Sequence, residues 1–370
     1  VTFKEGGTNF TNSLLVGTDG TGTLNDANSN TGVGTGVLAA LTTGDLNTAV
    51  GFDSLKANTT GEQNTAYGAC SLNANTTGSR NVAFGRHALD TNVSGNSNTA
   101  IGDQSLFANT ASNNTALGFY SMASNTSGSS NTGLGQNALT ANTTGASNVA
   151  VGNSALLANT TASNNTAVGC GAGAANTTGV SNTAVGHAAL NDNTTASNNT
   201  AIGMNSLAVT TTGCQNTAVG AGAMDTNSTG DNNVAVGFSA LDANTTADNN
   251  TAVGHSALKT TTTGSENTAL GINSSYSNTT GSCNVALGRN ALYTTTTGGQ
   301  NIAIGTAALY SNTTAINNTA VGSNALLSNT TGTDNVALGL CSIYTNTTGA
   351  QNTAVGGLSL KLTTTGAANT

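Results

Sequence analysis

The chain has 370 residues, of which 6% are charged and 48 are glycine, and it contains no proline and no tryptophan. Globular domains carry about a quarter charged residues, so Asn, Thr, Ser and backbone groups must hydrate this surface, which argues against an enzyme. The formal charge of −8 is spread thinly, without the clustered Lys and Arg that nucleic-acid binding requires. No window approaches the ~20 apolar residues that span a bilayer, so we expect no membrane insertion.

Residues 1–29 precede the regular part of the chain. The opening Val1-Thr2-Phe3-Lys4-Glu5 has neither the basic nor the apolar region of a secretory leader, so either a leader has been removed or the chain is a segment of something longer. The stretch 13–17 matches one degenerate unit of the repeat that follows.

A 17-residue repeat occupies residues 30–368. Units begin at Asn30 and Asn47 and continue to Asn352, giving 20 units with the consensus N-T-A-V-G-x-x-A/S-L-x-x-N-T-T-G-x-x, whose positions are numbered 1 to 17 below. One unit, 98–113, has 16 residues, and we expect its turn to absorb the deletion without shifting the strands. Residues 369–370 begin a further unit, so we expect the native protein to continue.

The repeat predicts an all-β parallel β-solenoid, or β-roll, with two short strands in each of about 20 coils. Positions 2–4 favour one extended strand, and the Ala/Ser-Leu pair at positions 8–9 favours a second. Gly at position 5 and Asn-Thr-Thr-Gly at positions 12–15 tolerate positive φ or bond to their own backbone. A helical solenoid is excluded, because its repeats run to about 33 residues or more. Stacked at ~4.7–4.9 Å per coil, 20 coils would form a rod roughly 95 Å long.

Identical residues in successive coils should form ladders. We expect the asparagines at position 1 to form an amide ladder inside the coil or at a corner. Large apolar residues recur at only two positions, which predicts a narrow core built from position 4 (Val50, Tyr67, Phe84, Ile101, Leu117) and position 9 (Leu55, Leu72, Leu89, Leu106).

So narrow a core favours self-association, as a homotrimer or a filament, to bury further surface. Position 3 is Ala in all but two of the 20 units, as close approach across an oligomer axis requires. The candidate oligomer interface is therefore this row, in particular Ala49, Ala66, Ala83, Ala100 and Ala116. The alternative is that Ala fits a tight interior corner.

The units Asn47-Thr48-Ala49-Val50-Gly51 and Asn81-Val82-Ala83-Phe84-Gly85 carry a family resemblance. The repeat resembles the head repeats of trimeric autotransporter adhesins, and more closely the N-T-A-V-G arrays of phage tail-fibre-like and environmental surface filament proteins. The resemblance implies a left-handed parallel β-roll, three chains around an axis, and an extracellular spacer or adhesive role. This chain departs from adhesin heads in its longer unit.

The acceptor pattern N-x-S/T for N-linked sugar recurs at position 12, where we expect the side chains to point outward in one row. Such a row would carry covalent glycans, although Asn-Thr-Thr-Gly is also good turn chemistry in its own right. Thr replaces Asn at Thr210, Thr261, Thr295 and Thr363, which fits the turn interpretation or O-linked sugar. The candidate glycosylation sites are Asn58, Asn75, Asn92, Asn125, Asn142, Asn159, Asn176, Asn193, Asn227, Asn244, Asn278, Asn312, Asn329 and Asn346.

Catalytic and metal sites find little support in the sequence, and we expect no cofactor. The histidines His87, His187 and His255 lie in distant units and are expected to be separate surface residues. Five cysteines in non-adjacent coils predict free thiols and no disulfide framework; they are Cys70, Cys170, Cys214, Cys283 and Cys341.

The leading hypothesis is a structural one: the shaft of an extracellular fibre or filament, from a virion or a microbial surface. The second is an adhesive module that binds a surface glycan or a receptor through variable positions, for example Phe119, Tyr120, Tyr293 and Tyr310. Ice binding is a minor alternative, because only position 2 places Thr on a strand.

Overall fold

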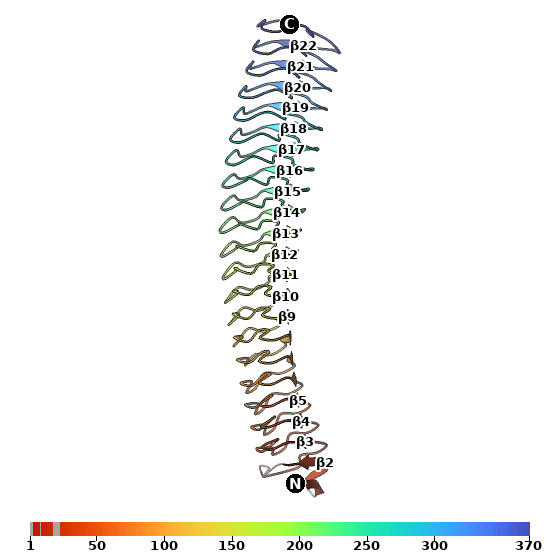
Figure 1. The fold of residues 1–370 in the computed structure, drawn as a ribbon, viewed down its shortest axis with the longest axis vertical. Coiled ribbons are helices and arrows are strands. Elements are labelled where there is room, and N and C mark those ends of the chain that lie inside the picture. Colours follow the sequence, from red (N-terminus) through yellow and green to blue (C-terminus); the bar gives the residue numbers. More distant parts are fainter. Residues whose placement is uncertain (1–2, 8, 18–22) are drawn as a thin grey trace. The chain divides into compact units, whose positions relative to one another are not determined.

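The computed structural model describes residues 3–7, 9–17 and 23–370. Within these residues the protein is all-β, with strands joined by turns and bends and no helix. The chain divides into two units, Val1–Asn182 and Thr183–Thr370. Each unit is a parallel β-solenoid in which one coil of about 17 residues stacks on the next (Figure 1). The predicted fold class is confirmed.

The first unit begins with a hairpin and continues as a parallel stack. Strands β1 and β2 pair antiparallel, and from β2 onward each strand pairs in parallel with the next. The β2–β3 register places Leu15 opposite Gly32, so the degenerate stretch 13–17 lies over the first full repeat. The strands are β1 (Phe3–Gly7), β2 (Phe10–Val16), β3 (Thr31–Val33), β4 (Thr48–Val50), β5 (Thr65–Tyr67), β6 (Val82–Phe84), β7 (Thr99–Ile101), β8 (Thr115–Leu117), β9 (Thr132–Leu134), β10 (Val149–Val151) and β11 (Thr166–Val168).

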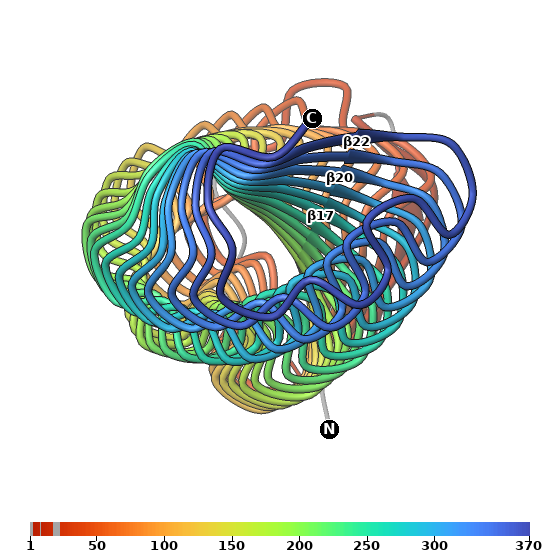
Figure 2. The same ribbon diagram turned by 90° about the horizontal axis from the view of Figure 1, so that it is seen from above.

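The second unit is a parallel stack throughout its described strands. Every neighbouring pair is in register, so that position 2 of one repeat lies opposite position 2 of the next. Viewed along the stack, β17, β20 and β22 lie in succession on one side of the coil (Figure 2). The strands are β12 (Thr183–Val185), β13 (Thr200–Ile202), β14 (Thr217–Val219), β15 (Val234–Val236), β16 (Thr251–Val253), β17 (Thr268–Leu270), β18 (Val285–Leu287), β19 (Ile302–Ile304), β20 (Thr319–Val321), β21 (Val336–Leu338) and β22 (Thr353–Val355).

Each coil contains one strand, at positions 2–4, so the prediction of a second strand around positions 8–9 is wrong. In the coil that begins at Asn47, the backbone turns instead: Asp53 has φ 53° and Leu55 has φ 48°, both left-handed. Residues in a β-strand have negative φ, so this segment cannot form a strand. It is nevertheless tied to its neighbours, because Leu55 N–H donates to the Ser71 carbonyl of the next coil at 3.0 Å.

Glycine at position 5 is required by the close spacing of the coils. Gly85 has φ 140°, a conformation essentially confined to glycine, and a Cβ placed on it would lie 2.4 Å from the carbonyl oxygen of Gly102. A positive φ recurs at this position throughout both units, from 113° at Gly356 to 140° at Gly85, which explains why no coil replaces this residue. The predicted tolerance of positive φ at position 5 is therefore confirmed.

The core contains positions 1, 3, 8, 9 and 12, and not position 4. Leu55, Leu72, Leu89 and Leu106 are fully buried, as predicted for position 9. The prediction for position 4 is wrong: its side chains point outward, Val50 half-buried and the others at exposed fractions of 50% for Tyr67, 52% for Phe84, 38% for Ile101 and 47% for Leu117. Successive strand residues face opposite sides, so an interior Ala at position 3 forces its neighbours outward.

The short unit 98–113 keeps its strand in register, as predicted. Ile101 pairs with Leu117, and Thr99 with Thr115. The missing residue is absorbed in the turn, where Asn109 Nδ2 donates to the Ala111 carbonyl two residues on, at 2.8 Å. In full-length units the equivalent bond reaches three residues on, as from Asn58 to Gly61.

Candidate functional site: amide ladders and outer rows

The asparagines of the acceptor pattern lie inside the coil. Asn58 Nδ2 donates to the Gly61 carbonyl at 2.9 Å, and Asn75 Nδ2 donates to Asn58 Oδ1 of the preceding coil at 2.8 Å. The expected outward row is therefore wrong, and a glycan on one of these amides is incompatible with the folded coil. At exposed fractions of 0–1%, the buried set is Asn58, Asn75, Asn92, Asn125, Asn142, Asn159, Asn176, Asn193, Asn227, Asn244, Asn278, Asn312, Asn329 and Asn346.

Threonine at position 12 interrupts this ladder. Thr261 and Thr295 are fully buried, so neither presents a hydroxyl for O-linked sugar. Each follows a coil whose asparagine has a buried Oδ1 without a partner, Asn244 before Thr261 and Asn278 before Thr295. The shorter threonine side chain makes no hydrogen bond to the amide oxygen of the preceding coil, so each interruption leaves one acceptor unsatisfied.

A second amide ladder runs through position 1, as the sequence predicts. Asn64 Nδ2 donates to Asn47 Oδ1 at 3.1 Å and to the Gly78 carbonyl of its own coil at 2.8 Å. Its own Oδ1 accepts from both N–H groups of Asn81, the backbone at 3.0 Å and Nδ2 at 3.1 Å. Each such asparagine therefore closes its own coil and ties it to both neighbours.

The alanine row lies in the interior of a single chain, so its prediction as an oligomer interface is wrong. These side chains are fully buried by the chain's own coils: Ala49, Ala66, Ala83, Ala100 and Ala116. Space is short there, because a Cβ on Gly32 would lie 2.5 Å from Leu15 Cδ2, and one on Gly133 would lie 2.7 Å from Ser121 Oγ. The tight interior corner accounts for alanine at position 3.

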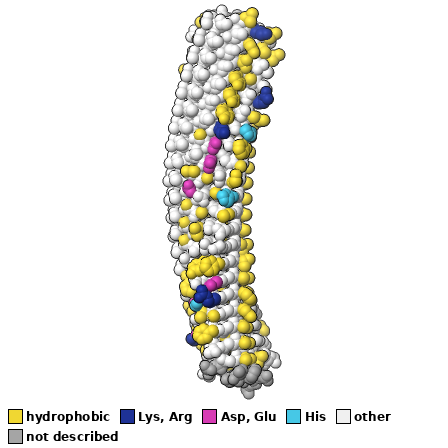
Figure 3. Space-filling view, in the orientation of Figure 1, with side chains coloured by type: hydrophobic (Ala, Val, Ile, Leu, Met, Phe, Trp, Pro, Cys, Tyr) yellow, Lys and Arg dark blue, Asp and Glu magenta, His cyan; other side chains and the backbone are white. Residues whose placement is uncertain are grey.

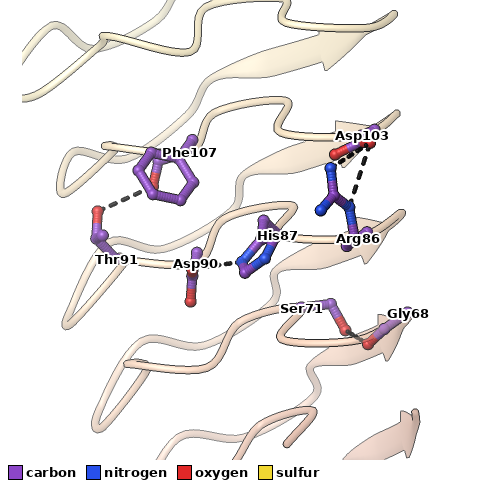
Figure 4. Close-up of polar contacts among 8 residues, drawn as sticks. All are labelled: Gly68, Ser71, Arg86, His87, Asp90, Thr91, Asp103 and Phe107. Atoms are coloured by element: carbon purple, nitrogen blue, oxygen red, sulfur yellow. Dashed lines mark hydrogen bonds and ion pairs between the residues drawn. The ribbon is translucent and has the colours of Figure 1, made fainter. Parts of the chain in front are cut away.

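The ion pairs among the described residues join side chains of the same coil or of neighbouring coils. In the first unit, His87 Nδ1 lies 2.8 Å from Asp90 Oδ2, and Arg86 forms an ion pair of 3.0 Å with Asp103 of the next coil (Figure 4). Among the described residues, no three His, Cys, Asp or Glu side chains group closely enough to hold a metal ion. The described part of the chain also has no helix long and apolar enough to cross a membrane.

The five cysteines are free, as expected. Cys283 Sγ donates to Glu266 Oε2 of the preceding coil at 3.4 Å, and this bond, together with burial and the glutamate charge, raises the pKa of the thiol. Burial raises the pKa of the Cys70 thiol, helped by the charges of Asp90 and Asp53. Both thiols are thereby held in the protonated, less nucleophilic form.

Hydrophobic side chains form rows on the outside of the coils, a feature that the sequence interpretation missed. Figure 3 shows such rows running in the stacking direction, among few charged side chains. One row is position 4 of the strands, where Ile202 is 41% and Leu270 51% exposed. Across the 20 repeats, positions 2 and 4 contain only Thr, Val, Ile, Leu, Tyr and Phe, and no charged residue. The sequence indicates these rows, because side chains alternate along a strand and position 4 must face outward when position 3 faces inward.

A column of stacked tyrosines lies at position 10 of successive repeats in the second unit. Tyr276, Tyr293 and Tyr310 stack with ring centroids 5.2 and 5.1 Å apart and nearly parallel planes. Lys259 Nζ lies 6.0 Å from the Tyr276 ring centroid, at one end of the column. The ring faces contact one another, so the middle ring presents only its edge to the outside.

No protein-family model matches the chain, and no curated protein shows significant similarity to it. The resemblance to adhesin heads and filament arrays therefore stays a prediction that rests on the repeat pattern.

Proposed function

We propose that this chain is the shaft of an extracellular fibre or filament, of virion or microbial surface origin, whose work is to provide length, stiffness and a display surface. The observation that carries the proposal is the position-1 ladder. At Asn64 one buried amide bonds to the preceding coil, the following coil and its own turn. In other coils, as at Asn148, the backbone N–H of the asparagine makes the bond to the preceding coil and the amide bonds to its own turn. Bending such a stack requires breaking buried hydrogen bonds, which are expensive to leave unmade.

The surface composition supports an extracellular setting. With 6% charged residues, hydration falls to Thr, Asn and Ser side chains, which do not depend on pH or salt as ion pairs do. A shaft exposed to changing surroundings benefits from that independence.

Length should follow the number of coils. Inserting a second copy of residues 199–368, which are ten units of 17 residues, should lengthen the particle by about 48 Å at ~4.8 Å per coil. Electron microscopy of negatively stained particles measures the contour length of the duplicated and original chains. An unchanged length, or a globular second copy, would contradict the shaft.

A second candidate function is recognition of a glycan or receptor, favoured by the neighbouring rings of Phe119, which is exposed, and Tyr120, which is half-buried. Their ring centroids lie 4.4 Å apart with planes tilted by 54°, and Phe119 is 48% exposed. Such rings offer an apolar face to a pyranose ring. A glycan array in which Phe119→Ser removes saturable binding supports this role, and an array without any binding rejects it.

A further inference from the structure

The outer face of the strands in the second unit is an uncovered apolar stripe. Its side chains project from position 4 of eleven consecutive strands, β12 to β22, each half-buried or exposed. All are aliphatic, and Thr, Val or Ile at position 2 continues the same face one row over. The stripe, named here the strand face, consists of Val185, Ile202, Val219, Val236, Val253, Leu270, Leu287, Ile304, Val321, Leu338 and Val355.

We propose that the strand face is the surface through which two copies of this chain pair, sheet against sheet. The proposal deepens the proposed function, on which its biological purpose rests, because two joined shafts resist bending more than one. The strand face also replaces the alanine row as the candidate interface, because the alanine row is buried within each chain and cannot contact a partner.

The area of the strand face suits a stable pair. At roughly 60 Å² of exposed apolar surface per position-4 side chain, eleven coils present about 650 Å², and the methyl groups of position 2 add to this. A standard interface buries about 800 Å² per partner, and uncovered apolar patches of several hundred Å² mark interaction sites. No charged side chain occurs at either position to oppose close packing.

The spacing of the strand face identifies the occupant as another copy. Its side chains recur once per coil, at the 4.7–4.9 Å spacing of paired strands, over the whole row. A second strand face has rows with the same spacing, so the ridges of one copy can lie in the grooves of the other without losing register. Packed sheets lie about 10 Å apart with side chains interdigitated in this way, and an isologous pair uses the same surface twice.

The test is the mass of the chain in solution, measured by multi-angle light scattering on the unmodified protein and on three variants. The pair V236K/L270K places two charges in the strand face, and V236T/L270T removes apolar surface with a residue that strands already contain. The control T246K/T280K places the same charges at position 14 of the same two coils, where both threonines are exposed. Circular dichroism checks that each variant retains its β-structure.

The pairing predicts twice the chain mass of 35.9 kDa for the unmodified protein and for T246K/T280K. It predicts the single mass for V236K/L270K and at least tenfold weaker pairing for V236T/L270T. A single mass for the unmodified protein, or a double mass retained by V236K/L270K, would overturn the proposal. The contour length of V236K/L270K separates the two ideas: loss of pairing should leave the length per coil unchanged, whereas failure of the shaft changes the length whatever the mass.

Discussion

Asn75 Nδ2 and Asn58 Oδ1 are joined by a buried hydrogen bond of 2.8 Å that links two residues 17 positions apart. The same bond recurs between Asn142 and Asn125 at 2.7 Å. A turn residue that would otherwise be solvated is thereby converted into an element of the core.

Replacing Asn64 by Ala should destabilise the first unit by about 3–5 kcal/mol, because it removes the buried amide, leaves the Asn81 N–H without its partner and takes one of two donors from the Gly78 carbonyl, which keeps Asn75 Nδ2. Urea titration followed by circular dichroism measures the change. Glu62→Ala, at an exposed position of the preceding turn, is the control and should change stability by less than about 0.5 kcal/mol. Equal effects of the two substitutions would contradict the ladder.

Replacing Thr261 by Asn should stabilise the second unit by about 1 kcal/mol, because the new amide can donate to the unpartnered Asn244 Oδ1. The comparison is Thr263→Asn, which adds the same side chain at an exposed position of the same turn. Both proteins should be produced without glycosylation. A loss of stability in Thr261→Asn would show that an amide at this position does not complete the ladder.

The sequence predicts the period, the parallel stack and the position-1 ladder, because these depend only on which residues recur. The sequence interpretation places Val50 in the core and Ala49 at an oligomer interface, whereas Val50 points outward and Ala49 is buried. Alternation along the strand contained the answer: if Asn47 is interior, Ala49 must share its side and Val50 must face out. Hydrophobicity alone places the position-4 side chains in the core, whereas Ala at position 3, Leu at position 9 and hydrogen-bonded Asn fill it.

The position-12 asparagines could not be placed from sequence, because Asn-Thr-Thr-Gly is equally consistent with an outward acceptor and an inward amide. Only the backbone path of the turn, which aims Asn58 at the Gly61 carbonyl, decides between them. The left-handed φ of Leu55 was also unforeseen, since leucine rarely adopts it. It is imposed by the ladder bond to Ser71 and by burial of the side chain.

Two glycines of one coil should respond differently to alanine. Gly220→Ala should cost more than about 4 kcal/mol, because φ is 138° and the new Cβ would lie 2.5 Å from the Gly237 carbonyl oxygen. Gly222→Ala should cost about 1 kcal/mol, because its φ of 63° is shared by Ala188 at 53° in the same position and its nearest neighbour is 3.5 Å away. Thermal unfolding of the two variants provides the comparison, and a reversed order would refute the argument.

A single deletion should be tolerated in the turn and not in the strand. Removing Thr246 should cost about 1–2 kcal/mol, since the unit 98–113 already lacks one residue in this turn and keeps its register. Removing Ala252 should unfold the second unit, because the shift would move Asn250 or Val253 to the wrong face. Circular dichroism of the two deletion variants distinguishes them, and equal tolerance would contradict the assigned faces.

Asp225 should make the second unit more stable in mild acid. Burial, and then the neighbouring charge of Asp242, raise the pKa of Asp225 above its ordinary value of 3.8. The folded state therefore holds this proton more tightly than the unfolded state, so the stabilisation is present below the unfolded pKa and is lost as pH rises through the folded pKa. Urea titrations at pH 4 and pH 7 should show a smaller gain on acidification in Asp225→Asn, and an unchanged gain would exclude this carboxyl as its source.

The most direct test of the central claim, that buried asparagine amides hold the stack together, is hydrogen exchange of the side-chain amides followed by NMR in D₂O. The Nδ2 protons of Asn64 and Asn75 should persist for hours, whereas those of the exposed Asn96 and Asn153 should exchange at once. Prompt exchange at Asn64 and Asn75, or a hexose mass attached to either, would contradict this claim.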